Sequence, residues 1–142
     1  MNKLNDISVM VESLSRIYHR LRKEVNGQLI TEGLSMSKMK ILHLITTGKT
    51  SATDIKNYMG FSSRTVVTVL DALEKEEMLK RQQSPTDRRV KYVYITEKGL
   101  EKLKIAENTH KIILNRIFSP LSPIQLEQFK EVCNTLESKN QQ

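Results

Sequence analysis

Cysteine and long apolar runs are nearly absent from this sequence. Its 142 residues include one cysteine, Cys133, which excludes an internal disulfide, and nothing indicates an oxidising compartment. No stretch approaches the roughly 20 apolar residues that a membrane-spanning helix requires. The first ten residues, MNKLNDISVM, interrupt a short apolar stretch with charge, so they do not fit a secretory signal. We therefore expect the protein in the cytoplasm.

Glycine and proline are also scarce, with five and three copies, and all lie at or near the expected element boundaries. No repeat, low-complexity tract or Gly/Ser linker divides the chain, and its length suits one compact domain. We therefore expect a single domain over residues 1–142. The apolar fraction, 38%, is somewhat below the usual globular share, so a subunit interface would supply the missing burial.

Acidic residues are outnumbered, since 16 Asp and Glu face 23 Lys and Arg and leave a formal net charge of +7. Such an excess favours polyanionic partners, either nucleic acid or an anionic membrane surface. Charge alone does not choose between them. The membrane surface gains no support from the sequence, because no helix pairs a basic face with bulky aromatic residues.

Apolar residues recur at three- and four-residue steps in six segments, which predicts amphipathic helices. The first helix runs from about Leu4 to Leu29. The others begin at polar residues suited to capping a helix N-terminus, which are Ser35, Ser51, Ser62, Thr96 and Ser122.

Two of these helices are short and adjacent. In the first, over residues 51–60, Ile55, Tyr58 and Met59 are expected to face inward. In the second, which starts at Ser62, the buried face is expected to consist of Val66, Val69, Leu70 and Leu73. Two helices joined by a tight turn at residues 60–61 match a helix-turn-helix.

A change to two-residue alternation predicts strands over residues 79–83 and 91–96. The segment SPTDRR between them is a polar turn, so a β-hairpin with Arg88 and Arg89 at its tip is expected. Residues 79–95 carry five positive charges against the one negative charge of Asp87. More than half of the net charge of the chain therefore lies in this segment.

The fold class is predicted to be mainly α, an α+β winged helix. We expect a winged helix-turn-helix lobe over residues 34–98, flanked by helices over residues 1–30 and 99–140. A helix fits the major groove of DNA and reads bases with its N-terminal part, while arginine is attracted to the minor groove. The predicted DNA-binding residues are Ser62, Ser63, Arg64, Thr65, Thr68, Lys80, Arg81, Asp87, Arg88, Arg89 and Lys91. Among them, Arg64 is the candidate for a guanine contact, and Asp87 is placed to pair with Arg89.

The stretch SSRTVVTVLDALEKEEMLKRQQSPTDRRVKYVYITEKG resembles the signature of the multiple-antibiotic-resistance regulator (MarR) family. The resemblance rests on the start of the helix after Ser62, on the D-x-R pair of Asp87 and Arg89, and on the I-T-x-x-G that follows. It implies a homodimeric transcriptional regulator, often a repressor of an inverted-repeat operator. It also implies that the helices over residues 1–30 and 99–140 are dimerisation helices, which interlock across the two-fold axis. It further implies that Arg89 enters the minor groove, braced by Asp87. Many members release DNA when a small phenolic or anionic molecule binds between the lobe and the dimerisation helices.

The chain departs from the family pattern at three positions. Glu77 stands where a glycine usually precedes the first wing strand, so we expect either a longer helix or a different turn. Thr68 and Ala72 replace basic residues common in the recognition helix. These changes leave open an alternative from another class, a winged-helix protein-interaction module without DNA binding.

Other chemistry finds little support. His19, His43 and His110 lie on three different predicted helices, and no zinc-ligand spacing occurs near them, so no metal site is expected. Cys133 falls on an apolar stripe and is interpreted as a packing residue. No catalytic or phosphate-loop motif appears, so we expect neither an enzyme nor a bound cofactor.

Overall fold

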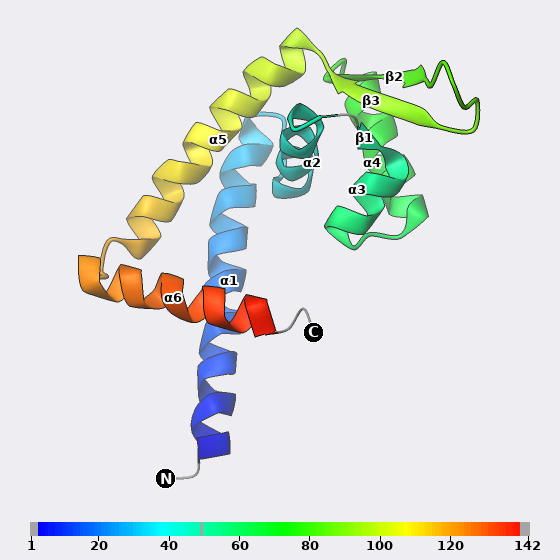
Figure 1. The fold of residues 1–142 in the computed structure, drawn as a ribbon. Helices are drawn as coiled ribbons and strands as arrows, with labels where there is room; N and C mark the ends of the chain where they lie inside the picture. Colours follow the sequence, from blue (N-terminus) through cyan, green and yellow to red (C-terminus); the bar gives the residue numbers. More distant parts are fainter. Residues whose placement is uncertain (1–2, 49, 140–142) are drawn as a thin grey trace.

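The computed structural model describes residues 3–48 and 50–139. Residues 1, 2 and 140 of the predicted dimerisation segments lie outside the described residues. Along the chain follow α1 (Lys3–Thr31), α2 (Met36–Thr46), β1 (Thr50–Ser51), α3 (Ala52–Met59), α4 (Ser63–Lys75), β2 (Leu79–Gln83), β3 (Lys91–Ile95), α5 (Glu97–Phe118) and α6 (Pro123–Lys139). The six helices and the two wing strands follow in the predicted order and confirm the predicted winged helix, whereas β1 was not predicted (Figure 1).

The predicted N-terminal caps are all present. Oγ of Ser35 accepts from the backbone N–H of Lys38 at 3.2 Å, and Ser51 and Asp54 form a reciprocal capping box. Ser122 exchanges the same pair of hydrogen bonds with Gln125. Each cap satisfies backbone donors that the first turn of a helix leaves without partners. Local sequence chemistry therefore sets where these helices begin.

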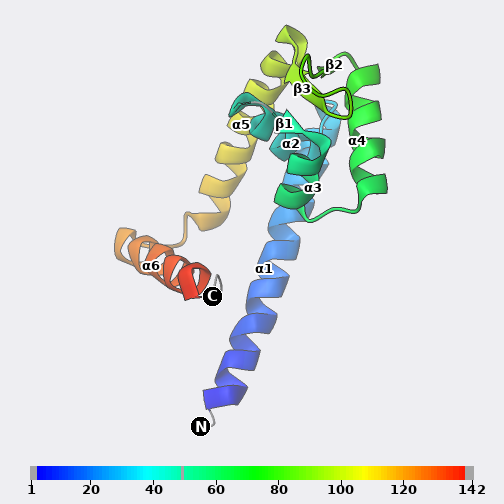
Figure 2. The same ribbon diagram turned by 45° about the vertical axis from the view of Figure 1, so that its right-hand side comes forward.

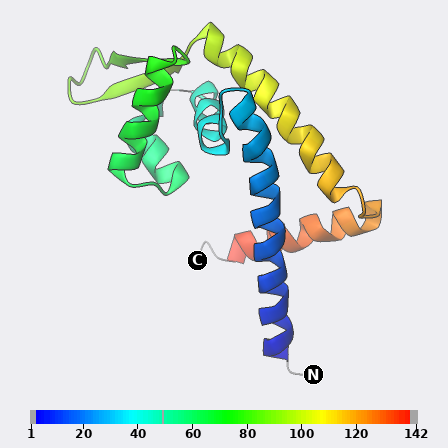
Figure 3. The same ribbon diagram turned by 180° about the vertical axis from the view of Figure 1, so that it is seen from behind.

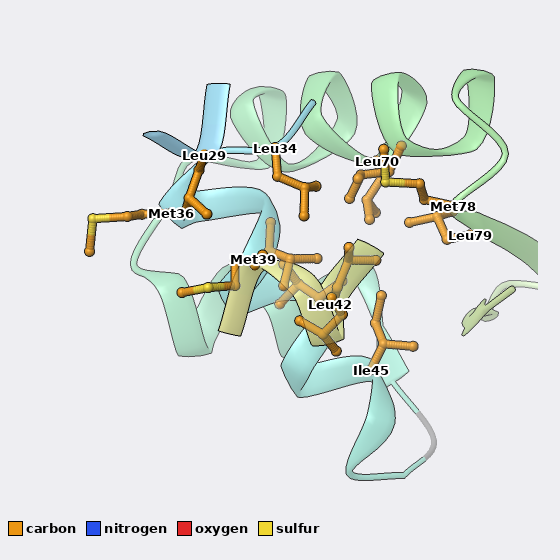
Figure 4. Close-up of a cluster of buried hydrophobic side chains, with 14 of the residues drawn as sticks. Leu29, Leu34, Met36, Met39, Leu42, Ile45, Leu70, Met78 and Leu79 are labelled. Atoms are coloured by element: carbon orange, nitrogen blue, oxygen red, sulfur yellow. The ribbon is translucent and has the colours of Figure 1, made fainter. Parts of the chain in front are cut away.

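The core lies in the lobe, where one continuous cluster of apolar side chains joins every element except α6 and β1 (Figure 4). In α4 the predicted stripe is confirmed, because Val66, Leu70 and Leu73 are at most 2% exposed and Val69 packs against them. The C-terminal part of α1 contributes Val25 and Leu29. The first helix is thereby anchored to the lobe at one end only.

The sheet has three strands in the order β1-β3-β2, not the two that were predicted. Thr50 pairs with Val93 and Ser51 with Tyr92, both antiparallel. A two-residue strand shows no alternation and depends on partners 41 and 43 residues away, so the sequence pattern missed it. The extra strand ties the segment before α3 to the hairpin of residues 79–95, which is called the wing below.

Two further expectations were wrong. Tyr58 is 62% exposed rather than inward-facing, because Ile55 and Met59 on the two-turn α3 already fill the contact with the core. At Glu77 neither expected alternative occurs. The helix ends at Lys75, and Glu77 itself adopts the left-handed conformation, with φ of 63°.

The turn at Glu77 keeps the hydrogen bonds of a Schellman motif. The N–H of Met78 donates to the carbonyl of Leu73 at 2.9 Å, and that of Glu77 donates to Glu74 at 3.0 Å. Leu73 and Met78, both buried, supply the apolar contact that accompanies this motif. A glycine is therefore not required for the geometry, although a non-glycine residue is strained there.

Large apolar side chains stay exposed on α1 and α6. The N-terminal half of α1 extends away from the lobe (Figure 1), and α6 stands apart from α1 when the molecule is turned (Figure 2). Exposed residues on the two helices include Ile7, Val11, Leu14, Tyr18, Leu126, Phe129, Val132 and Leu136. A monomer rarely leaves so much apolar surface in water. None of the described helices contains an apolar stretch long enough to cross a bilayer.

Candidate nucleic-acid interface

The turn between α3 and α4 presents the N-terminus of α4 at the surface. Gly60 ends α3 in the left-handed conformation, with φ of 68°, and its N–H donates to the carbonyl of Lys56. Ser62 caps α4 two residues later by accepting from the N–H of Thr65 at 3.1 Å. The chain therefore reverses within three residues, and α4 lies along the outside of the lobe beside the wing (Figure 3).

All five residues predicted for α4 are exposed, but their hydroxyl groups are partly engaged. The hydroxyls of Ser62 and Thr65 are 2.9 Å apart and share a hydrogen bond. Oγ1 of Thr68 donates to the carbonyl of Arg64 at 3.0 Å. No hydrogen bond from the side chains of Ser63 and Arg64 is found among the described residues. Arg64 is thus the predicted residue of this helix with charged donors open to a ligand.

Sequence reasoning missed Val67, a residue on the exposed face of α4. Its side chain is 50% exposed, and it lies three residues after Arg64 and four before Asp71, on the same side of the helix. Helical spacing alone would have found this position. It was overlooked because polar residues were taken to define the face.

The wing tip is a turn held by its own hydrogen bonds. Oγ of Ser84, which is buried, accepts from the N–H groups of Thr86 and Asp87 at 3.3 and 3.2 Å. The N–H of Ser84 donates to Val90 at 2.8 Å, and Nε2 of Gln83 donates to the carbonyl of Arg88 at 2.8 Å. These bonds fix the backbone that carries the tip arginines.

The predicted pairing of Asp87 with Arg89 is present. Nε of Arg89 lies 3.2 Å from Oδ1 of Asp87, and the side chains are 90% and 41% exposed. An ion pair this exposed adds little stability. Its effect is to restrict the guanidinium to one side of the tip while the guanidinium stays open to solvent.

Arg81 occupies a different position from the other basic residues of the wing. Its guanidinium pairs with Asp71 and lies 3.8 Å from Glu74, both on α4, and its side chain is only 26% exposed. It is therefore engaged in joining β2 to α4. Lys80, Arg88 and Lys91 are exposed, and within the part of the chain that the structure describes none of them has an ion-pair partner.

The wing is locked to α4 and α5 at its base. Oγ1 of Thr96 donates to the carbonyl of Glu77 at 2.6 Å and accepts from the N–H of Gly99 at 3.0 Å. The backbone of Gly99 lies so close to the carbonyl of Met78 that an added Cβ would approach its oxygen to 2.1 Å. Tight contact of this kind holds the segment between α4 and β2 against the start of α5.

A separate pocket of about 380 Å³ lies between the lobe and α5. It is lined by Met39, Lys40, His43, Tyr58, Glu107, His110 and Lys111. Nδ1 of His43 lies 2.9 Å from a carboxylate oxygen of Glu107. Burial, with a contribution from Lys40, lowers the pKa of His110.

His19 does not line this pocket, so the three histidines are not brought together. Residues 3–48 and 50–139 contain no group of three or more side chains placed to hold a metal ion. Cys133 is half-buried on α6.

Sequence comparisons agree with this geometry. Residues 34–91 match the MarR family. The chain is 32% identical over 120 residues to the HTH-type transcriptional regulator MhqR of Bacillus subtilis, covering 84% of this chain and 83% of that protein. It is 26% identical to the transcriptional repressor MprA of Escherichia coli (strain K12), covering 88% and 70%.

Solved structures share the fold. The transcriptional regulator BldR from Sulfolobus solfataricus matches with a TM-score of 0.84 at 24% identity, over 98% of this chain and 99% of that one. A mutant MarR from E. coli, complexed with operator DNA, matches with a TM-score of 0.81 at 14% identity, over 96% and 99%. At these identities the likeness establishes the winged-helix architecture.

Proposed function

The chain belongs to the MarR family of transcriptional regulators, which are not enzymes, and we propose that it represses transcription by binding an inverted-repeat DNA site as a homodimer. The observation that carries this proposal is that two exposed features lie on neighbouring elements, α4 and the wing, which Arg81 joins. They are the exposed N-terminal half of α4 and an arginine tip held by Asp87.

The two features suit neighbouring grooves of one duplex. The first turns of α4 enter the major groove, where Arg64 reads guanine through paired hydrogen bonds. The wing reaches the adjacent minor groove with Arg89, whose guanidinium is drawn by the negative potential there. Phosphates are contacted by Lys80, Arg88 and Lys91. Arg81 instead holds the wing against α4.

The homodimer would form through the exposed apolar faces of α1 and α6. The predicted dimerisation segments, residues 1–30 and 99–140, contain these two helices and most of α5. The lobe of residues 34–98 then stays free for DNA. Burying these side chains in a second copy removes apolar area from water at roughly 25 cal/mol per Å². In a two-fold dimer the two copies of α4 lie about one helical turn of DNA apart.

Selection of bound sequences from random duplexes tests the proposal. The expected result is an inverted repeat with half-site centres about 10 base pairs apart. If no sequence is enriched while the protein remains folded, the alternative of an interaction module without DNA binding replaces it. Because the proposed target is DNA, we assign the protein to the cytoplasm.

An effector site is proposed in the pocket between the lobe and α5. Lys40 and Lys111 supply positive charge beside the ring of Tyr58, a combination that suits a small anionic aromatic ligand. Since α2 and α3 belong to the lobe and α5 to the dimerisation part, a ligand there would change lobe spacing by favouring one arrangement.

Salicylate, a simple phenolic carboxylate, is a practical probe of that site. Calorimetric titration should show binding that Lys111→Gln weakens. Lys104→Gln, on the same helix outside the pocket lining, is the matched control. Equal affinities for the two variants would place the ligand elsewhere.

A further inference from the structure

On the exposed face of α4, Val67 is the large apolar side chain, at 50% exposure. An apolar group on a surface helix needs no explanation by itself. The position of Val67 is informative, because Arg64 precedes it by one turn and Asp71 follows it by one turn on the same side of the helix. Val67 thus occupies the middle of the surface proposed to enter the major groove.

Most polar groups around Val67 are committed to other partners. Asp71 and Glu74, four and seven residues later on the same strip of the helix, face the guanidinium of Arg81. The hydroxyl hydrogen of Thr68 is used on the carbonyl of Arg64. Ser62 and Thr65 share a hydrogen bond with each other. These bonds reduce the donors that the helix can offer to base edges.

What remains is the guanidinium of Arg64, the hydroxyl group of Ser63 and an apolar surface. In the major groove the thymine C5-methyl is the apolar feature of the four bases, and small apolar side chains contact it. Arg81 offsets one of the two negative charges of Asp71 and Glu74. Arg64 on the same strip carries a second positive charge, so the strip that carries Val67 brings no net negative charge toward the phosphates.

We propose that Val67 is a specificity-determining residue that reads a thymine methyl group in each half-site. This inference rests on the proposed function and deepens it, since it names the chemistry of the recognised base. Arg64 selects guanine, and Val67 selects thymine against cytosine at a neighbouring position. Thr68 adds its own methyl group to the same contact surface.

Replacing thymine by deoxyuridine tests the inference, because the change removes the methyl group and leaves base pairing intact. Each thymine of the selected repeat is replaced in turn, and affinity is measured by fluorescence anisotropy. Loss of one contacted methyl group should weaken binding by the wild-type protein about fourfold, the factor expected for one buried methylene.

Val67→Ala should bind the thymine duplex more weakly and discriminate thymine from deoxyuridine by less than about twofold at that position. Asn57→Ala is the control, because Asn57 is exposed on α3, outside both the proposed DNA contacts and the dimerisation helices. It should keep the wild-type discrimination. Both positions are exposed, so neither change removes a core contact.

The outcomes distinguish a failure of this inference from a failure of the proposed DNA-binding function. If wild type and Asn57→Ala bind the repeat, yet Val67→Ala keeps the full preference for thymine, Val67 does not read the methyl group and the proposed function stands. The same holds if no replacement weakens the wild type. If no duplex is bound specifically by any of the three proteins, both fall together.

Discussion

One oxygen of Asp87, Oδ1, accepts two hydrogen bonds from Arg89, at 3.0 Å from its backbone N–H and at 3.2 Å from Nε. The first bond shapes the turn and the second aims the guanidinium. The two residues therefore act as a unit in which the carboxylate orders the arginine before DNA arrives. Ordering a long side chain in advance reduces the entropy cost of binding.

Asp87→Asn should weaken binding to the selected duplex by about 1 kcal/mol, although it removes a negative charge from a DNA-binding surface. The loss is expected because the amide holds Arg89 less firmly. In an Arg89→Ala background the same change should have no further effect, which a double-mutant cycle measures. Tighter binding by the single variant would show that Asp87 only repels phosphate.

The left-handed residue Glu77 is a site for stabilisation. Glu77→Gly should raise the free energy of unfolding by up to about 1 kcal/mol, because glycine adopts positive φ without the steric cost. Glu77→Ala keeps that cost and should give no gain. Urea denaturation of the three proteins checks this, and equal midpoints for glycine and alanine would remove strain as the cause.

The close contact at Gly99 should make this position intolerant of any side chain. Gly99→Ala is expected to destabilise the protein by about 1–3 kcal/mol, the usual cost of overpacking, and to weaken DNA binding because the wing base shifts. Gly27→Ala is the matched control. It lies in α1 with no atom within 4 Å of an added Cβ, so alanine should be neutral or stabilising there.

Stability should fall on mild acidification in a way that depends on His110. Burial lowers the pKa of this residue below 6.5 in the folded protein, so protons bind the unfolded chain preferentially. The stability that neutral His110 contributes is fully present above pH 6.5. It is lost as the pH falls from there toward the pKa of His110 in the folded protein. His110→Gln should therefore show a smaller drop in melting temperature between pH 7 and pH 5 than the wild type.

If the melting temperature of His110→Gln falls with pH as much as that of the wild type, other titratable groups cause the fall. Glu107 and Lys40 face this histidine, and Glu107 also contacts His43. Because Glu107 raises the pKa of His110 and Lys40 lowers it, Lys40→Gln should reduce the fall in melting temperature between pH 7 and pH 5.

Local signals in the sequence predicted most of the fold. Each cap, such as Ser62 or Thr96, involves residues within one turn, so residue type and spacing suffice. The apolar stripe of α4 follows from the helical period, and Arg89 lies at a tip set by Pro85 and Asp87. For the same reason, the pairing of Asp87 with Arg89 could be predicted from the sequence.

Features that depend on distant residues were not predictable in this way. The strand at Thr50 exists because β3 offers it a partner. Arg81 was grouped with the phosphate contacts because its pairing with Asp71 appears only when the wing folds against α4. At Glu77, tertiary contacts around Met78 outweigh the preference for glycine.

The most direct test of the account is the affinity of Arg89→Ala for the selected inverted repeat, compared with Arg16→Ala, which removes the same charge from α1. The account predicts that Arg89→Ala weakens binding by 1 kcal/mol or more, about fivefold or greater, while Arg16→Ala stays near wild type. Equal affinities for the two variants would contradict the claim that α4 and the wing tip engage one duplex together.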